Sequence, residues 1–447
     1  MTRPLHDLTA ALLTAARRAG ADAADAIAVD GQSVSIDIRA GRLEQAERAE
    51  GVEIGLRVLV GGRQACVSAS DISDRTIATM AERAVAMARE APVDPYAGLA
   101  EADILAQDRD ATPLDLCDPA DPPSAAALED VARRAEAAAM AQTGIVQVEA
   151  GAGHTLRHVH LAATNGFAGG YARSSISVSA VAFTGSGTQM ERDWAGEGRI
   201  HMADLPGAEG IGTLAAERAL SRAGARKPPT GAFPVLYDER VASSLIGHLL
   251  SAANGATVAR GSGWLRDRLG QQVLPATLSV IEDPHRPRTS ASRPFDAEGL
   301  PTRRRLIVQG GVLTGWVLDL ATARKLGMPS TANAARGPSA PPSPSTSNID
   351  LTPGSASRDD LIAAMGTGLL VTALIGSSIN PTTGDYSRGA SGFWVENGQI
   401  AYPVNECTIA GNLRDMLMRL TPANDARAHL STRVPSLLVE GLTIAGA

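Results

Sequence analysis

Residues 33–70 read SVSIDIRAGRLEQAERAEGVEIGLRVLVGGRQACVSAS, and the architecture of the N-terminal part follows from them. Apolar and polar side chains alternate through residues 34–39, as on a half-buried β-strand. Gly41-Arg42 reads as a turn, and Gly61-Gly62 is a typical two-residue hairpin connection. The stretch therefore predicts an antiparallel meander of four strands, at residues 33–39, 43–49, 52–60 and 64–70.

Helical patterns border this meander and the unit after it. Apolar residues recur at helical spacing in residues 5–19 and 71–91, and Gly20 is a suitable helix end. A Pro- and Asp-rich linker follows. The same order of helix, antiparallel strands and helix is then predicted again, with helices at 124–141 and 205–225 around strands at 146–151, 156–163 and 174–183. We expect an N-terminal αβ meander domain at residues 1–100 and a central αβ unit at 101–226, which can pack together as one domain.

Residues 227–447 are predicted to form a larger, β-rich C-terminal domain. A helix is expected at 239–253, Gln309-Gly310-Gly311 and Asn397-Gly398 are predicted hairpin turns, and strands are expected at 233–237, 278–281, 305–309, 312–318, 368–375, 392–396, 399–403 and 437–444. Residues 329–353 are dense in Pro, Ser, Ala and Asn and have little to bury, which predicts a lid or interface flap that is mobile in the isolated chain. The predicted fold class is α+β, with antiparallel sheets and flanking helices in the N-terminal half.

Composition narrows the class of protein. The 447 residues suffice for two or three domains, and 44% hydrophobic and 20% charged residues are ordinary globular values. The net charge of −7 argues against nucleic acid or an anionic membrane as the main partner. The three cysteines stand far apart, and neither a signal peptide nor a membrane-spanning segment is recognisable, so the cytoplasm is expected.

Few residues suggest chemistry by themselves. The sequence has no GxSxG nucleophile motif and no phosphate-binding glycine loop. His154, His158 and His160 form HxxxHxH, but no carboxylate follows nearby, so a polar strand surface is favoured over a metal site. His248 is a lone imidazole on an apolar helix, which favours a packed, hydrogen-bonded core residue. We therefore expect no catalytic residue and no metal in this chain.

One segment stands out, residues 380–404, NPTTGDYSRGASGFWVENGQIAYPV. Its small residues would let another backbone approach closely, and its polar and aromatic side chains offer hydrogen bonds and stacking. The candidates for binding a substrate or partner are Asp385, Tyr386, Arg388, Gly389, Ser391 and Trp394. The alternative is a tightly packed structural hairpin in which Arg388 pairs with Asp385.

This segment resembles the PmbA/TldE side of the TldD/PmbA family, and the resemblance extends over nearly the whole chain. The matching stretches are EGVEIGLRVL (50–59), TNGF (164–167), PFDAEGLPTRR (294–304), ARKLG (323–327), MGTGLLVT (365–372), GDYSRGASGFW (384–394) and IAGNL (409–413).

The resemblance implies a paired metallopeptidase. A TldD-type subunit carries HExxxH and zinc, and the PmbA/TldE-type subunit has a similar fold and forms a heterodimer with it around the site. In this chain Gly247-His248 matches the end of that motif, while Ser243 and Ser244 stand at its first His and its Glu. The implied function is the zinc-lacking subunit of a peptidase that degrades or matures unfolded peptides, inactive alone.

Two other functions stay open at this point. One is a non-catalytic peptide-binding or scaffold protein that acts alone. A homodimer of the isolated chain stays open as well. The other is a stand-alone hydrolase with an unrecognised site, which the absence of a nucleophile motif disfavours.

Overall fold

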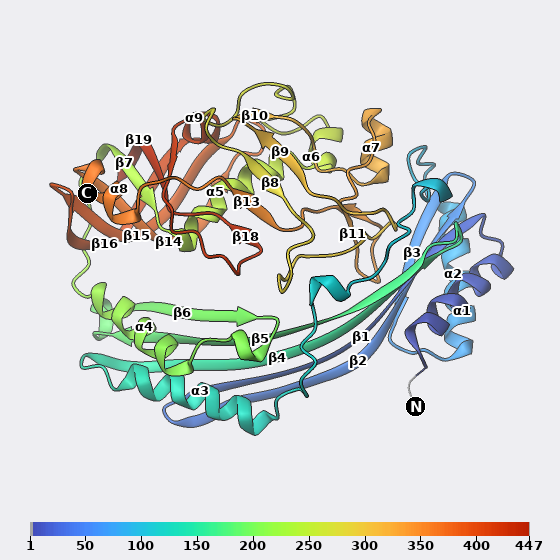
Figure 1. The fold of residues 1–447 in the computed structure, drawn as a ribbon, viewed down its shortest axis with the longest axis horizontal. Helices are drawn as coiled ribbons and strands as arrows, with labels where there is room; N and C mark the ends of the chain where they lie inside the picture. Colours follow the sequence, from blue (N-terminus) through green and yellow to red (C-terminus); the bar gives the residue numbers. More distant parts are fainter. Residues whose placement is uncertain (1–2, 447) are drawn as a thin grey trace.

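The computed structural model describes residues 3–446, in which a long curved sheet lies against a C-terminal domain (Figure 1). The sheet has six strands in the order β3-β2-β1-β4-β5-β6, and each neighbouring pair is antiparallel. Their bounds are β1 Ala23–Arg39, β2 Arg42–Val60, β3 Arg63–Ala69, β4 Ile145–Ala163, β5 Ala168–Thr184 and β6 Glu191–Arg199. Because β1 pairs with β4, one continuous sheet spans both predicted N-terminal units.

The predicted meander needs two corrections. Residues 43–49 and 52–60 do not form separate strands, because β2 continues through Gly51, which lies opposite Gly31 of β1. In addition, the strand predicted to begin at residue 33 begins at Ala23. The strand β6 escaped prediction, since its charged and glycine-containing sequence lacks a clear alternation.

Helices cover one face of the sheet at its two ends. They are α1 Leu5–Ala19 and α2 Asp74–Glu90 at one end, and α3 Ala125–Met140 and α4 Ala208–Ser221 at the other. Leu8, Leu12 and Ile77 pack against the sheet in the first core, and burial of such side chains stabilises each helix by roughly 2 kcal/mol per residue. The Ala-rich pair α3 and α4 packs more closely, so a Cβ atom at Gly212 would collide with the Ala135 carbonyl. Short 3-10 turns lie at Ala102–Ile104, Thr112–Leu114, Gly187–Gln189 and Met202–Asp204.

The C-terminal domain is built on a barrel. The strands run in the order β16-β15-β14-β7-β19-β17, and an additional β16–β19 pairing closes the sheet. Their bounds are β7 Gly231–Tyr237, β14 Gly368–Ile379, β15 Asp385–Glu396, β16 Gln399–Asn412, β17 Leu420–Pro422 and β19 Leu437–Ala445. The predicted turn Asn397-Gly398 is confirmed, and both residues have positive φ.

Smaller elements complete this domain. A second sheet has the order β10-β9-β8-β13-β18, and a two-stranded piece joins β11 to β12. The remaining bounds are β8 Val280–Glu282, β9 Arg305–Gln309, β10 Val312–Leu313, β11 Ala334–Ala335, β12 Ser343–Pro344, β13 Ile349–Leu351, β18 Thr432–Arg433, α5 Glu239–Ala252, α6 Gly255–Ala259, α7 Leu320–Leu326, α8 Arg358–Met365 and α9 Leu413–Met418. The strand predicted at 312–318 is much shorter than expected, because the chain leaves the sheet after Leu313.

The segment 329–353 differs from its prediction. We expected it to have little to bury, yet Ala334, Asn348 and Ile349 are at most 1% exposed. The side chain of Asn348 donates hydrogen bonds to the Asp283 carbonyl (2.8 Å) and to Ser292 Oγ (2.7 Å). The segment is therefore part of the domain core, and polar side chains rather than apolar ones hold much of it.

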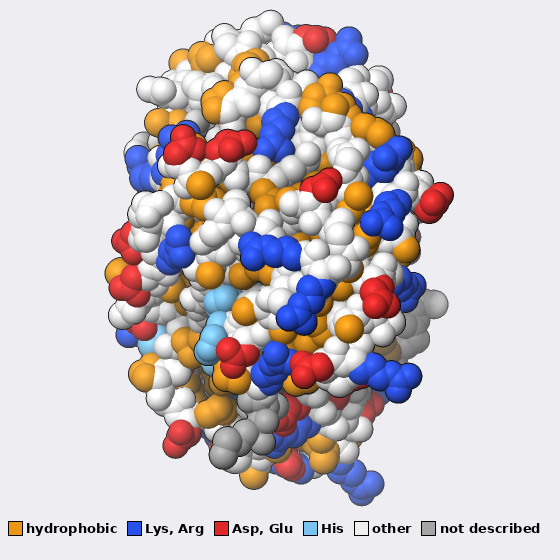
Figure 2. Space-filling model, turned by 90° about the vertical axis from the view of Figure 1, so that its right-hand side faces the viewer, with side chains coloured by type: hydrophobic (Ala, Val, Ile, Leu, Met, Phe, Trp, Pro, Cys, Tyr) orange, Lys and Arg blue, Asp and Glu red, His pale blue; other side chains and the backbone are white. Residues whose placement is uncertain are grey.

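One face of the molecule is of mixed charge. Figure 2 shows the face that carries α1, α2 and α7, where basic and acidic side chains are interspersed. Within residues 3–446, helices of the length and hydropathy needed to span a bilayer are absent.

Candidate functional site

Helix α5 begins where the buried strand β7 ends. Asp238 is its N-cap, and its carboxylate accepts a hydrogen bond from the backbone N–H of Arg240 (3.2 Å). A carboxylate at this position also complements the helix dipole. On the other side, Leu245, Ile246 and Leu249 are fully buried in the domain. Apolar packing and a polar cap therefore fix the helix that carries Ser243, Ser244 and His248.

The three motif positions lie on the less buried side of α5. Ser244 Oγ donates to the Val241 carbonyl (2.7 Å), within its own helix. The His248 ring meets the Tyr386 ring edge-on, with 6.0 Å between centroids. Its Nε2 is shielded from solvent and has no hydrogen-bond partner among the described residues. Burial, and then the nearby Arg388 guanidinium, lower the pKa of His248, so its ring is neutral near pH 7.

These residues do not fit a zinc ion. A neutral imidazole is a suitable ligand, but zinc sites need three or four N, S or carboxylate donors. Here Ser243 and Ser244 offer only hydroxyls, and the charge that His248 experiences from Arg388 is positive. Among residues 3–446, three or more His, Cys, Asp or Glu side chains nowhere gather in a way that could hold a metal. The HxxxHxH histidines are separate as well, since His160 bonds to Thr9 Oγ1 (2.9 Å) and His158 lies near Asp30 (3.9 Å).

The candidate hairpin residues divide into an interior and a surface group. Tyr386 and Trp394 are each 2% exposed and Ser391 is 3% exposed. Trp394 packs edge-on against Phe233, with 4.9 Å between ring centroids, and Ser391 Oγ accepts from Arg222 Nη2 (2.5 Å). In this conformation all three belong to the core rather than to a surface that a peptide reaches.

Tyr386 forms a buried phenol pair with Tyr237, whose hydroxyl lies 3.5 Å from its own. Burial raises the pKa of both phenols, so both stay protonated at neutral pH. Tyr386, one member of the pair, lies beside His248 on this side of α5.

Asp385, Arg388 and Gly389 remain nearer the surface. Asp385 is exposed and accepts from Thr383 Oγ1 (2.6 Å) and Asn412 Nδ2 (2.9 Å), which lower its pKa. Arg388 Nε donates to the Gly376 carbonyl across the hairpin (2.8 Å). The described contacts of Arg388 do not include Asp385, so the ion pair within the turn that the structural alternative requires does not form. A Cβ at Gly392 would collide with the Leu370 carbonyl. The backbone that lies close to this glycine is therefore β14 of the same chain.

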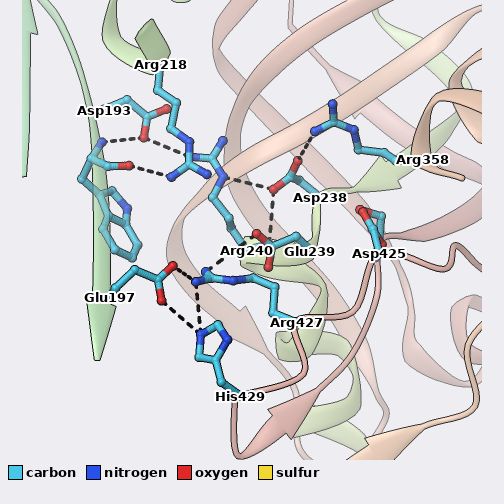
Figure 3. Close-up of polar contacts among 12 residues, drawn as sticks. Asp193, Glu197, Arg218, Asp238, Glu239, Arg240, Arg358, Asp425, Arg427 and His429 are labelled. Carbon is cyan, nitrogen blue, oxygen red and sulfur yellow. Dashed lines mark hydrogen bonds and ion pairs between the residues drawn. The ribbon is translucent and has the colours of Figure 1, made fainter. Parts of the chain in front are cut away.

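A polar network joins the first turn of α5 to the N-terminal sheet (Figure 3). Asp193 of β6 pairs with Arg240 (3.1 Å) and Arg222 (3.3 Å). Asp238 in turn pairs with Arg240 (3.0 Å) and Arg358 (3.1 Å). Arg240 therefore bridges the two halves of the molecule, and both of its carboxylate partners are buried.

Two titratable groups of this network have displaced pKa values. Burial, and then repulsion from Asp238, raise the pKa of Glu239 to about 7. Burial and three arginines lower the pKa of His429 to about 4, although Glu197 lies 3.1 Å away. Arg427 pairs with the same Glu197 carboxylate and so neutralises the charge that would otherwise stabilise a protonated His429.

A second buried network joins the segment 329–353 to the N-terminal sheet. Arg57 Nη2 pairs with Asp25 (2.5 Å), and Arg336 pairs with the same carboxylate. Nearby, burial and then the charge of Asp296 raise the pKa of Glu298 to about 8. The pKa of Asp296 itself is raised to about 6 by its complete burial.

Sequence reasoning missed both networks. The run Asp238-Glu239-Arg240 is a signal that could have found the first, because three charged residues directly after an apolar strand form a strong N-cap pattern. The Asp25–Arg57–Arg336 network has no local signal, since its members come from β1, β2 and a distant loop.

Comparisons with known proteins bear on this geometry. Residues 24–88 match the PmbA/TldA metallopeptidase domain 1, residues 118–223 the central domain and residues 230–446 the C-terminal domain. The chain is 38% identical to metalloprotease PmbA of Escherichia coli O157:H7, over 92% of this chain and 90% of that relative. This chain belongs to the PmbA/TldD metallopeptidase family.

A further relative and two solved structures match nearly the whole chain. A PmbA homolog of Haemophilus influenzae is 36% identical, over 96% of this chain and 94% of its own. A crystal structure described as a putative modulator of DNA gyrase from Bacteroides thetaiotaomicron superposes with a TM-score of 0.89 at 27% identity, covering 99% of this chain and 98% of that one. TldE from Thermococcus kodakarensis gives a TM-score of 0.85 over 98% of this chain and 100% of its own, and at 18% identity it shows the PmbA/TldD fold alone.

Proposed function

We propose that this chain is the zinc-lacking, TldE-type subunit of a heterodimeric metallopeptidase in the cytoplasm. Its partner is a TldD-type homologue that carries HExxxH and zinc. The observation that carries the proposal is the donor set of α5, where Ser243 and Ser244 stand at two of the three motif positions. With one imidazole at the motif positions, hydroxyls in place of the other imidazole and the carboxylate, and a neighbouring arginine, this helix has lost the means to hold zinc and to activate water.

The substrates proposed are unfolded or flexible peptides, which the pair degrades or matures. An enclosed site between two subunits admits an extended chain and excludes a folded domain. Main-chain pairing with a sheet edge would hold such a chain without demanding a particular sequence. In this division of labour the present chain binds and orients, and it contributes no group to the bond-breaking step.

Co-expression with an HExxxH-bearing homologue from the same genome tests the proposal. We expect co-elution of the two chains, about one zinc per pair by mass spectrometry, and cleavage of an unstructured peptide by the pair alone. The isolated chain should hold much less than one zinc. Stoichiometric zinc in the isolated chain that disappears in His248→Ala, or cleavage by that chain alone, would overturn the proposal.

The same experiment addresses the non-catalytic alternative. If the chain does not bind the homologue, forms a homodimer and binds peptides by itself, it is a peptide-binding or scaffold protein acting alone. Light scattering on the mixed and separate chains distinguishes a homodimer from a heterodimer.

A further inference from the structure

Two adjoining cavities lie at the end of the C-terminal domain that carries α6 and α9. Their volumes are about 460 and 150 Å³, and Trp264, Arg268 and Arg414 line both. Arg266 and Thr382 line the larger one as well. We call this place the arginine pocket. It is separate from α5 and its networks, since none of their charged residues lines it.

Positive charge dominates the larger cavity. Three arginines line it, and Asp267 is its acidic member, while Asp415 lines the smaller cavity. Asp267 pairs with Arg266 (3.0 Å), but their side chains are 80% and 54% exposed, and such surface pairs contribute at most about 1 kcal/mol. Arg268 donates to the neutral amide of Gln271 (2.9 Å), which leaves its charge uncompensated. For the Arg414 side chain, neither a hydrogen bond nor an ion pair to another described residue is found.

The pocket has a rigid floor. Trp264 is 4% exposed, and its backbone N–H donates to the Pro381 carbonyl (3.1 Å). Gly384 packs directly on its indole, since a Cβ there would lie 3.3 Å from Trp264 Cγ. Asn412, the N-cap of α9, donates to the Thr383 carbonyl (3.1 Å) and so ties Arg414 to the same turn. The guanidinium groups therefore project from a fixed support, which reduces the entropy that a ligand must offset.

We infer that the arginine pocket binds a carboxylate group of an acidic, extended peptide. The inference rests on the proposed function, because it names the class of peptide that the pair would take. A guanidinium matches a carboxylate with two parallel hydrogen bonds, and it keeps its charge at any physiological pH. The larger cavity suits one or two side chains, at the lower end of the usual range for ligand sites. The turn 381–384 joins the pocket to β15, so a peptide anchored here lies beside the candidate hairpin.

Direct binding to the full-length chain tests the inference without any cleavage. The probe is a fluorescein-labelled unstructured peptide with two adjacent glutamates at a free C-terminus. Its control has glutamines and an amidated end. We expect fluorescence anisotropy to show the acidic peptide binding at least tenfold more tightly, with an affinity that falls as salt rises.

Substitutions place that binding in the pocket. Arg268→Gln together with Arg414→Ala should weaken the acidic peptide at least tenfold, while Arg75→Ala, at an exposed arginine of α2, should leave it unchanged. Circular dichroism and the melting temperature check that the double variant folds. Arg414→Ala alone, at an exposed side chain, should already weaken binding severalfold, which keeps the test decisive if the double variant fails to fold.

Several results would overturn the inference. Equal affinity for the acidic and amide peptides would do so, as would loss of binding in Arg75→Ala to the same degree. Inorganic phosphate shares the chemistry, so its competition is measured too. A phosphate affinity that exceeds the peptide's would make the pocket a phosphate site. If the acidic peptide binds as expected but the co-expressed pair does not cleave it, the proposed function fails and the pocket assignment stands.

Discussion

Gly392 shows how one residue fixes the hairpin. A Cβ atom there would collide with the Leu370 carbonyl of β14, so the two strands approach as closely as they do because this side chain is absent. We predict that Gly392→Ala lowers the free energy of unfolding by about 3 kcal/mol. Gly247→Ala is the matched control, since a Cβ at that helical position meets nothing within 4 Å and should be neutral or stabilising. Chemical denaturation of both variants checks this, and equal losses would refute the packing argument.

Glu239 makes stability depend on pH. Its folded pKa of about 7 lies above the unfolded value of 4.5, so the folded state binds the proton more tightly. The free energy of unfolding should therefore fall as pH rises from about 4.5 to 7 and level off above. We predict that Glu239→Gln removes this fall and is more stable than the parent at pH 8, by on the order of 1 kcal/mol after discounting for solvent screening.

Urea unfolding of both proteins at several pH values between 5 and 8 is the measurement. His429 contributes with the opposite sign, because its lowered pKa of about 4 makes stability rise with pH up to the unfolded value of 6.5. Taking the difference between parent and variant cancels that contribution. Parallel profiles for the two proteins would show that the Glu239 carboxyl is not displaced.

At the scale of elements, a side-chain hydrogen bond connects the two strands of the β14–β15 hairpin. Arg388 Nε bonds to the Gly376 carbonyl, and Ile375 beside it is 68% exposed. We predict that Arg388→Ala weakens heterodimer formation or raises the peptide KM, while zinc in the partner subunit stays unchanged. Arg388→Lys keeps the charge but loses the planar donor pair and should be intermediate. Assembly and cleavage indistinguishable from the parent in both variants would make the hairpin structural only.

The segment 329–353 is predicted to behave as two parts. Its end, around Asn348 and Ile349, is buried and hydrogen-bonded, so its amides should exchange slowly in the isolated chain. Residues 339–341 are exposed and should be the first site of protease cleavage. Hydrogen exchange followed by mass spectrometry checks the first part, and fast exchange throughout would restore the idea of a mobile lid.

Local patterns predicted elements better than their lengths. The helix 5–19 and the Asn397-Gly398 turn follow from spacing and turn chemistry, and the structure confirms both. The extent of β2 could not be predicted, because Gly51 reads as a break unless Gly31 is known to lie opposite it. The prediction for the segment 329–353 was wrong for a related reason, because the burial of this segment depends on hydrogen bonds to residues distant in sequence.

At the scale of the whole molecule, one buried carboxylate is among the groups that couple the two halves. Asp25 of β1 pairs with Arg57 and with Arg336 of the C-terminal domain, and all three side chains are buried. We predict that Asp25→Asn costs about 3–5 kcal/mol, because it leaves two buried guanidinium groups without their counter-charge. Glu50→Gln, at the exposed Arg48–Glu50 pair, should cost less than about 1 kcal/mol.

Thermal unfolding followed by calorimetry tests this coupling. The parent should unfold in one main transition and Asp25→Asn in two, as the sheet loses a buried ion-pair tie to the C-terminal domain. A single transition at an unchanged temperature would mean that the buried ion pairs contribute nothing to the coupling.

The candidate site was only partly predictable from the sequence. Ser243, Ser244 and His248 are adjacent in one helix, so the chain alone shows the loss of ligands there. The hairpin candidates were chosen by residue type, and type does not reveal that Trp394 is buried while Asp385 is exposed. The arginine pocket combines residues 266, 268, 382 and 414, which only the folded chain brings together.

The place of β19 in the barrel has a consequence for biosynthesis. This strand lies between β7 and β17 and also pairs with β16. Tyr237 of β7 lies opposite Leu437 of β19, so the β7–β19 strand pair cannot form until residue 437 has been synthesised. A nascent chain emerging from the ribosome therefore exposes one edge of β7 while the residues between them are still being translated. Such a long wait for a distant strand slows folding and invites aggregation. Newly made C-terminal domain should accordingly depend on chaperones that shield β7, whereas the N-terminal sheet can form ahead of it.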